Sequence, residues 1–259
     1  MIIKRKIQSL LKYNDVFSTP FEILKFRRVY RDTNGKSDSL VSLRVKEAKF
    51  PLFCRPSTTD SQVLWDTFSH KYHLPPFTLD KNATIVDLGA NAGYTMAHFA
   101  HLYPSSHIYG VEMNLENFLL AKKNLSPLEK QCKIIHAAIW FENGQVSYSG
   151  DAEWGYSIVR DNIENKSVQI KVDAKTIDSI FEENNLKIVD YLKMDIEGAE
   201  KLVLQNPQKW IHCVKSMKIE VHPPATLEEC EKILTAHGFR CYQDKTSTLP
   251  TIVAVRQSS

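Results

Sequence analysis

The stretch IVDLGANAGYTMAHF, residues 85–99, decides the fold of this chain. It begins with a short apolar run that ends at an aspartate, and it finishes with Met96 and Phe99 on one face of a predicted helix. Between these parts lie Gly89 and Gly93, which allow a tight backbone turn and leave main-chain N–H groups accessible to a ligand. The stretch therefore predicts a buried strand, a glycine turn and a helix in immediate succession.

Strands and helices alternate after this stretch. Helices are expected over 115–125, capped by Asn114, from about residue 197, and from the capping box Thr226–Glu229 to about Gly238. Short apolar strands are expected over 83–88, 107–112, 132–139, 188–195, 215–222, 239–243 and 251–257, and the strictly alternating segment 167–174 is expected to be an edge strand. This order predicts an α/β fold with a doubly wound, Rossmann-like, mostly parallel seven-stranded sheet, which binds ligands beyond the carboxyl ends of its strands.

Residues 1–80 precede this pattern and are expected to form a small α+β N-terminal extension of helix, hairpin and helix, with residues 81–259 as the ligand-binding domain. Asn34–Gly35, between FRRVY (26–30) and LVSLRVKE (40–47), predicts the hairpin. A helix is expected from about residue 60 to 72.

The chain starts with MIIKRKIQSLLKYNDVF, which has apolar residues at helical spacing interrupted by Lys4, Arg5 and Lys6. This pattern fits neither a signal peptide nor a membrane span, and a surface or subunit-packing helix is preferred to membrane docking. The extension is thus a candidate surface for forming a homo-oligomer. A formal net charge of +3 is too small to indicate nucleic-acid binding. The location expected for this protein is the cytoplasm.

The spacing of the glycine turn and two acids indicate its ligand. A dinucleotide-binding turn has the pattern Gly-x-Gly-x-x-Gly, whose middle glycine admits a pyrophosphate, whereas this chain has Gly89-x-x-x-Gly93. Asp87 would repel a diphosphate but suits a ligand with an ammonium group, such as S-adenosylmethionine. Glu112 ends the next strand, where an acid reaches ribose hydroxyls in nucleotide-binding βαβ units. These features favour S-adenosylmethionine over a dinucleotide.

Charged side chains alternate at the ends of two later strands. They are Lys193, Asp195, Glu197, Lys218, Glu220 and His222. Because burying such charges without partners is costly, they are expected to line a polar pocket shared with the glycine turn. For Glu200, a role at the helix N-terminus and a role in the site are equally favoured.

Five segments, in this order and spacing, resemble the FkbM family of S-adenosylmethionine-dependent methyltransferases: VDLGANAGYT, VEMNLENF, HAAI, VDYLKMDIEGAE and IEVH. The resemblance runs from about residue 83 to 222, and RPSTTDSQVLWDTF (55–68) resembles the segment before the family's core. It implies the class I methyltransferase fold and methyl transfer to a hydroxyl, typically on a sugar or a small natural product. The predicted cofactor residues are Asp87, Gly89, Ala90, Asn91, Gly93, Tyr94, Glu112, Asn114 and Ala137. Met113–Asn114 departs from the proline-containing turn that is more usual after the ribose acid.

An alcohol acceptor must lose a proton as its oxygen takes the methyl group. His222 is the favoured general base because its ordinary pKa is near neutral, with Glu220 or Asp195 orienting or replacing it. Glu197 and Trp154, from the loop segment SGDAEWGYSI (149–158), are the predicted acceptor-binding residues. Magnesium or manganese would suit an oxygen-rich cluster of Asp195, Glu197, Glu220 and His222, but the acids are also explained without a metal, so a divalent ion is not favoured.

Two other functions are weighed against an O-methyltransferase. One is a module that binds S-adenosylmethionine but has lost catalysis, and the other, less favoured, is an NAD-dependent dehydrogenase. His98 and His101 lie on the polar side of their predicted helix and are expected to be solvated.

Overall fold

The structure is a computed structural model that describes residues 12–31, 39–149, 157–159, 170–207 and 209–257. A seven-stranded sheet forms its centre, with the spatial order β12-β13-β11-β10-β3-β4-β5. Its strands are β3 (Thr84–Leu88), β4 (His107–Glu112), β5 (Cys132–His136), β10 (Tyr191–Met194), β11 (Ser216–Glu220), β12 (Phe239–Gln243) and β13 (Thr251–Arg256). Only β13 runs antiparallel to its two neighbours, so the predicted mostly parallel, seven-stranded sheet is confirmed.

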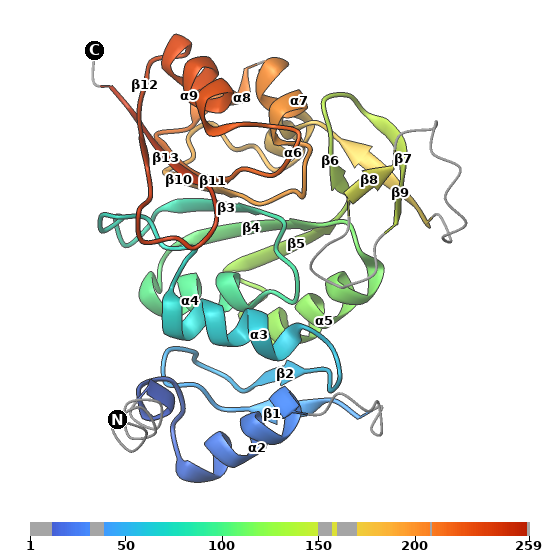
Figure 1. Cartoon of the computed structure of the whole chain (residues 1–259), viewed down its shortest axis with the longest axis vertical. Helices are drawn as coiled ribbons and strands as arrows, with labels where there is room; N and C mark the ends of the chain where they lie inside the picture. Colours follow the sequence, from blue (N-terminus) through green and yellow to red (C-terminus); the bar gives the residue numbers. More distant parts are fainter. Residues whose placement is uncertain (1–11, 32–38, 150–156, 160–169, 208, 258–259) are drawn as a thin grey trace.

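Helices cover both faces of this sheet (Figure 1). On one face lie α4 (Tyr94–Leu102), α5 (Leu115–Leu125) and the short η2 (Ser126–Leu128), and on the other lie α6 (Ile177–Glu183), α7 (Glu200–Gln205), α8 (Trp210–Cys213) and α9 (Leu227–Ala236). Each face has its own buried apolar cluster, which includes Phe99 and Leu120 on one side and Ile180 and Leu234 on the other. The predicted doubly wound α/β architecture is therefore confirmed.

Local signals place two helix starts correctly. The Asn114 side chain accepts a hydrogen bond from the main-chain N–H of Asn117, and Thr226 and Glu229 form the complete capping box of α9. The helix expected from about residue 197 begins instead at Glu200. The reason is that Glu197 and Gly198 have φ values of 55° and 99°, which a right-handed helix cannot contain.

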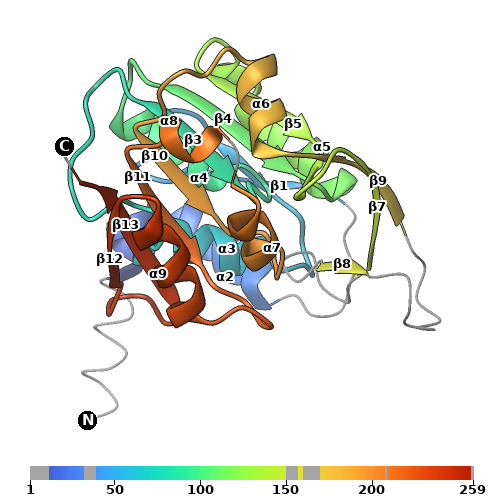
Figure 2. The ribbon, with the colours of Figure 1, turned by 90° about the horizontal axis from the view of Figure 1, so that it is seen from above.

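Beside the main sheet lies a second sheet, with the order β6-β9-β7-β8. Its strands are β6 (Ala138–Ile139), β7 (Gly144–Ser149), β8 (Ser157–Val159) and β9 (Ile170–Lys175), and Figure 2 shows β7, β8 and β9 at the opposite side of the molecule from α9. Two expectations are wrong here. The strand predicted over 132–139 is divided between the two sheets, and β9 is not an edge strand because it pairs with both β6 and β7. Its alternation has another cause: Val172 and Ala174 are buried, whereas Lys171 and Asp173 are exposed.

The N-terminal extension contains α2 (Pro20–Arg31), β1 (Val41–Leu43), β2 (Leu52–Cys54), α3 (Asp60–Trp65) and the π-helical turn η1 (Asp66–His70). The predicted hairpin is wrong, because FRRVY belongs to α2 and β1 pairs with β2 instead. Ile23, Phe26 and Val29 are buried along one face of α2, and this helical spacing outweighs the turn signal of Asn34–Gly35, which lies outside the described residues. The helix predicted over 60–72 is the α3 and η1 pair.

The extension packs against the α4 and α5 side of the sheet and shares its apolar core there. This contact explains why the expectation of a solvated His98 is wrong. His98 is fully buried, with its Nδ1 3.1 Å from His73 Nε2 and its Nε2 2.9 Å from Glu47 Oε2, and burial lowers its pKa to about 4. His101, nearer the end of α4, is half-buried.

Candidate active site

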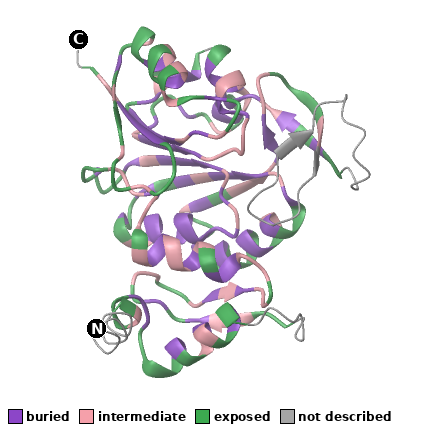
Figure 3. Ribbon diagram, in the orientation of Figure 1, coloured by how far each residue is buried: buried purple, intermediate pink, exposed green. Residues whose placement is uncertain are grey.

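A cavity of about 1030 Å³ opens beyond the carboxyl ends of the central parallel strands. One part of its wall comes from the ends of β3 and β4 and from Ala137 and Ile139, and a second from the ends of β10 and β11. The segment 62–76 and the loop 244–249 complete it. In Figure 3 the central strands leading to this edge are mostly buried, as expected for strands covered on both faces. The cavity lies where a doubly wound sheet places its ligands.

The glycine turn follows β3 as predicted. Gly89, Asn91 and Gly93 have φ values of 88°, 49° and 77°, so the chain uses the left-handed region three times before α4 begins. The N–H groups of Gly89 and Ala90 both bond to the carbonyl oxygen of Val111 at 3.0 Å, which fixes the turn against β4. Gly89 and Asn91 line the cavity.

Glu112 lies across the turn at the end of β4 and also lines the cavity. Its Oε2 accepts the N–H of Asn91 and its Oε1 accepts the N–H of Asn114, both at 2.8 Å. Burial raises the pKa of Glu112 to about 7, although these main-chain bonds oppose the shift. The carboxylate is thus fixed in orientation and titrates near neutral pH.

The nine predicted cofactor residues divide by access to the cavity. Gly89, Asn91, Glu112 and Ala137 belong to its lining, whereas Asp87, Ala90, Gly93, Tyr94 and Asn114 do not. Members of the second group support the first: Gly93 begins α4, Asn114 begins α5, and the buried Tyr94 hydroxyl donates to the carbonyl oxygen of Phe53 at 2.8 Å.

Asp87 is fully buried and lies inside the sheet edge. Its Oδ1 is 3.2 Å from Lys193 Nζ, and its Oδ2 accepts a short hydrogen bond from the Thr95 hydroxyl. Lys193, its neighbour on β10, also donates to the carbonyl oxygen of Gly89 at 3.2 Å. Burial lowers the pKa of Lys193, but Asp87 and Asp195 outweigh this effect and raise it well above its ordinary value. Asp87 and Lys193 therefore form a buried ion pair beneath the glycine turn.

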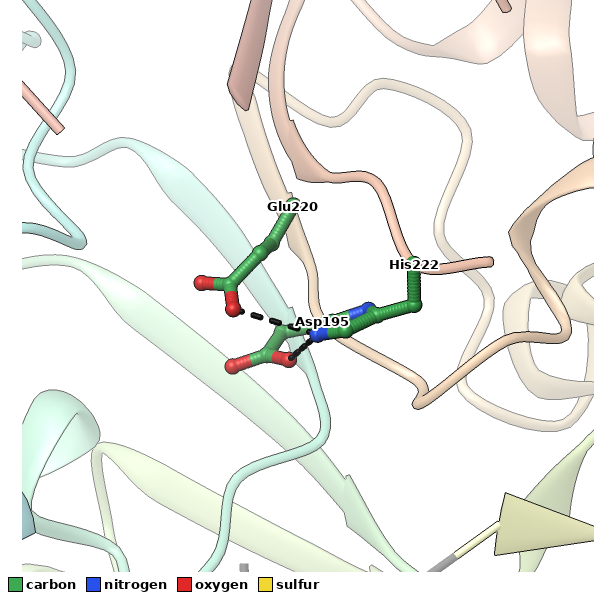
Figure 4. A group of neighbouring side chains, drawn as sticks. All are labelled: Asp195, Glu220 and His222. Atoms are coloured by element: carbon green, nitrogen blue, oxygen red, sulfur yellow. Dashed lines mark hydrogen bonds and ion pairs between the residues drawn. The ribbon is translucent and has the colours of Figure 1, made fainter. Parts of the chain in front are cut away.

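A second group of ionisable side chains surrounds His222 at the ends of β10 and β11. Figure 4 shows Asp195 and Glu220 both directed at His222 Nε2, at distances of 4.0 and 3.1 Å. Nδ1 of His222 is 3.0 Å from the fully buried Glu200, and Nε2 is 3.6 Å from Glu197. Burial alone would lower the pKa of His222, but the hydrogen bonds to Glu200 and Glu220 dominate and raise it to about 11. The imidazole is therefore a cation at neutral pH.

Glu197 reaches this group from the left-handed turn before α7. Glu200 holds that turn, because its carboxylate accepts the N–H of Ile196 at 3.2 Å and of Gly198 at 3.0 Å. Burial and the nearby Asp195 raise the pKa of Glu197 to about 8. Asp195, Glu197 and Glu220 line the cavity, whereas His222 and Glu200 are not among the described residues that line it.

The side chains around His222 lie close enough together to bind a metal ion. Ligand atoms of Asp195, Glu220 and His222 lie within 4.8 Å of one another. However, the hydrogen bonds that His222 makes with two carboxylates also account for the arrangement without an ion. A divalent metal stays an unfavoured hypothesis.

Two cavity walls were not foreseen from the sequence. Asp244 begins the loop 244–249 by accepting the N–H and hydroxyl of Thr246, and it pairs with Lys218 at 2.6 Å. The short Asp-x-Thr spacing is a local signal for such a turn. Tyr72 lines the opposite wall, from the extension, and no local signal marks it. The predicted acceptor residue Trp154 lies outside the described residues.

The sequence model of the Methyltransferase FkbM domain matches residues 87–241. A curated relative, the 2-O-methyltransferase NoeI of Sinorhizobium fredii, is 27% identical over 135 residues, which are 46% of this chain and 55% of the relative. The chain thus matches about half the length of that relative.

Solved structures that match this chain include two proteins of low sequence identity. The precorrin-6y C5,15-methyltransferase from Geobacter metallireducens has a TM-score of 0.45 and 13% identity, covering 77% of this chain and 90% of that one. The fibrillarin pre-rRNA processing protein of Methanococcus jannaschii has a TM-score of 0.46 and 13% identity, covering 87% of this chain and 85% of that one. Among the described residues, no helix has the length and apolar character needed to cross a bilayer.

Proposed function

Because the chain belongs to the FkbM methyltransferase family, we propose that it is an S-adenosylmethionine-dependent methyltransferase and that it methylates a hydroxyl of a sugar or a small natural product. The observation that carries this proposal is a single cavity that joins Gly89, Asn91 and Glu112 to Asp195 and Glu220. Groups suited to a nucleoside and carboxylates suited to a hydroxyl thus face one space. The relative's name, a 2-O-methyltransferase, supports oxygen as the methylated atom.

The donor end of the cavity fits the cofactor chemically. Each oxygen of a carboxylate has two acceptor positions, so Glu112 is able to bind ribose hydroxyls in addition to its main-chain donors. Val111, Ala137 and Ile139 provide apolar surface for an adenine ring. When bound, S-adenosylmethionine supplies an electrophilic methyl group on a positively charged sulfur. For Asp87 we propose an indirect role, in which its ion pair with Lys193 fixes the glycine turn.

At the acceptor end, the proton of the hydroxyl needs a base. His222, the base favoured by the sequence, already carries a proton at neutral pH and does not border the cavity among its described lining. We therefore assign the base role to Glu220 or Asp195, whose carboxylates border the cavity, and give His222 the role of positioning them. Glu197 is the carboxyl group proposed to hydrogen-bond other hydroxyls of the acceptor.

The charge of the cavity wall favours an acceptor without phosphate or carboxylate groups. The described lining contains the acids Asp66, Glu112, Asp195, Glu197, Glu220 and Asp244 but only two lysines, Lys71 and Lys218. Both lysines are already paired, with Glu47 at 2.8 Å and with Asp244 at 2.6 Å. An anionic acceptor, including a nucleic acid, would be repelled here, whereas a neutral or amino-bearing sugar would not.

The test begins with calorimetry of S-adenosylhomocysteine binding to the full chain. A labelled methyl donor is then offered with a panel of glycosides and hydroxylated natural products, each paired with its phosphorylated or carboxylated counterpart. Methyl transfer to neutral members, with little transfer to their anionic counterparts, is expected.

Each alternative gives a different result in the same test. A catalytically silent module would bind S-adenosylhomocysteine but methylate no member of the panel. An NAD-dependent dehydrogenase would bind NAD in preference to S-adenosylhomocysteine. Methylation of a nitrogen or carbon, with the hydroxyls left unmodified, would refute the proposed O-methyl transfer while leaving the family assignment intact.

A further inference from the structure

Helix α2 presents an outer face that combines apolar side chains with arginines. Phe21 and Leu24, one turn apart, expose 67% and 64% of their surface. Arg28 and Arg31 are also exposed and continue this stripe at helical spacing, and Arg27 is half-exposed beside them. A face of this composition has no role in the methyl-transfer site described above, and adjoining exposed apolar groups indicate a binding surface.

The acidic side chain of α2 faces the opposite way. Glu22 is the one acid of this helix and is buried on its inner side. Its carboxylate accepts the main-chain N–H of Arg44 at 2.9 Å and lies 2.9 Å from the Lys25 ammonium. The outer face of α2 therefore carries positive charge that no acid of the same helix offsets.

Helix α5 offers a comparison, because its exposed leucines lie near two exposed lysines, Lys122 and Lys123, but also beside an acid. On α5, Leu115 and Leu119 are also exposed, but Glu116 lies between them with most of its side chain in solvent. Its exposed leucines thus stand beside a negative charge. In Figure 1, α2 lies at the end of the molecule opposite α9, and Figure 3 colours much of its outer surface as exposed.

We propose that α2 docks this protein on an anionic lipid surface, with Phe21 and Leu24 at the boundary between headgroups and acyl chains. Arginines beside an apolar stripe are typical of helices that lie in such an interface, because the guanidinium groups bind lipid phosphates while the apolar side chains leave water.

Two other partners fit this face less well. A nucleic acid would also attract the arginines and would find a ring for stacking in Phe21, but Leu24 has no flat ring and would gain little from such a contact. In a two-fold contact with a second copy, each face meets its own equivalent, and the outer face of α2 offers no acid of that helix to pair with the arginines. Lipid phosphates complement the arginines and acyl chains complement Leu24.

The docking helix adjoins the catalytic cavity. The Tyr30 hydroxyl of α2 donates to the side-chain oxygen of Gln62 at 3.0 Å, and Gln62 belongs to the cavity lining. The surface contact would thus hold one wall of the cavity close to the lipid. This inference is independent of which acceptor is methylated.

The test uses flotation of the full chain with vesicles of phosphatidylcholine alone or mixed with phosphatidylglycerol. Wild-type protein is expected to bind only the mixed vesicles and to dissociate as salt is raised. Replacing Arg27, Arg28 and Arg31 together by alanine is expected to weaken binding on the order of a hundredfold. Phe21→Ala with Leu24→Ala is expected to weaken binding about tenfold, because apolar burial is lost. Leu115→Ala with Leu119→Ala, on α5, is the matched control and should bind as wild type.

Several results would overturn the proposal. One is that wild-type protein does not bind the mixed vesicles. Another is that the α5 variant loses binding as strongly as the α2 variants. Protein that binds single-stranded RNA but not vesicles would assign the face to nucleic acid. A dimer in sedimentation velocity that the Phe21 and Leu24 changes dissociate, without vesicle binding, would assign it to a second copy. Binding of S-adenosylhomocysteine checks that each variant is folded.

Discussion

Two groups of charged side chains lie at the same edge of the sheet but differ in charge balance and in access to the cavity. Asp87 and Lys193, on neighbouring strands, are buried and neutralise each other beneath the glycine turn. Around His222, by contrast, four carboxylates share one imidazole, and three of them border the cavity. The first group is balanced in charge and closed to ligands, whereas the second has excess negative charge and is open. Access and charge balance, rather than residue type, therefore separate a supporting pair from the group that we propose to be catalytic.

The largest effect is expected from Glu220→Gln. Glutamine keeps a hydrogen-bond acceptor for His222 but cannot take up a proton, so kcat should fall on the order of 10²- to 10⁴-fold for the acceptor found in the screen. Affinity for S-adenosylhomocysteine should be unchanged, and Glu228→Gln, on the exposed side of α9, serves as the control. If Asp195→Asn is inactive while Glu220→Gln is not, Asp195 is the base.

The pH dependence of kcat separates these carboxylates from His222. A neutral His222 acting as base would have to lose a proton held with a pKa of about 11, so kcat would rise about tenfold per pH unit above neutrality. A carboxylate base gives no such rise. A steep increase that His222→Ala abolishes would return the base role to His222.

The buried pair should dominate stability. Lys193→Met leaves Asp87 without its cation in a fully buried position, and we expect the free energy of unfolding to fall by about 3–5 kcal/mol. Lys215→Met is a matched control, because Lys215 pairs with Asp190 on the surface and such pairs contribute about 0–1 kcal/mol. Urea unfolding of both variants measures the difference. If both variants lose the same free energy of unfolding, the Asp87–Lys193 pair does not stabilise the glycine turn more than a surface ion pair would.

A smaller effect is expected at Glu112, and it depends on pH. Its ionised form accepts ribose hydroxyls best, so affinity for S-adenosylhomocysteine should weaken as pH falls below its pKa of about 7. Glu112→Gln should bind about tenfold more weakly at pH 8 and lose most of this pH dependence. Calorimetry between pH 6 and pH 8 tests both statements. A wild-type affinity that is constant over this range would contradict the proposed ribose contact.

The smallest effect is expected from metal removal. Because His222 and its carboxylates satisfy one another, treatment with a chelator should leave kcat unchanged. Loss of activity that added magnesium or manganese restores would establish a metal at Asp195, Glu220 and His222.

Short-range signals in the sequence predicted the parts of the fold that depend on neighbouring residues. The glycine turn after Asp87, the cap at Asn114 and the capping box at Thr226 each need only four or five residues, and all three are present. The mostly parallel sheet followed from the order of the elements. The pairing of β9 did not, because alternation shows that one side of a strand is covered but not which strands adjoin it.

Contacts between distant segments explain the remaining errors. His98 lies on a helix face that the extension covers, and its ring contacts His73 and Glu47, which come from other segments. The same limit applies to the site: strand ends placed Asp195 and Glu220 at one edge, but the positive charge of His222 results from Glu200, Glu220 and Glu197, which come together only in the fold. Tyr72 and Asp244 complete the cavity from regions that the sequence pattern did not connect with it.

Gly89 links the two ends of the site through the main chain. A side chain at this position would overlap the carbonyl oxygen of Asp195, and the N–H of Asp195 bonds to the carbonyl oxygen of Leu88 at 2.9 Å. The backbone that carries the donor site is thus in direct contact with the backbone that carries the acidic group, with no side chain between them to adjust. If donor and acceptor bind as proposed, this rigid seam aligns them, and changes in the loops around the cavity would alter acceptor specificity without disturbing the distance over which the methyl group moves.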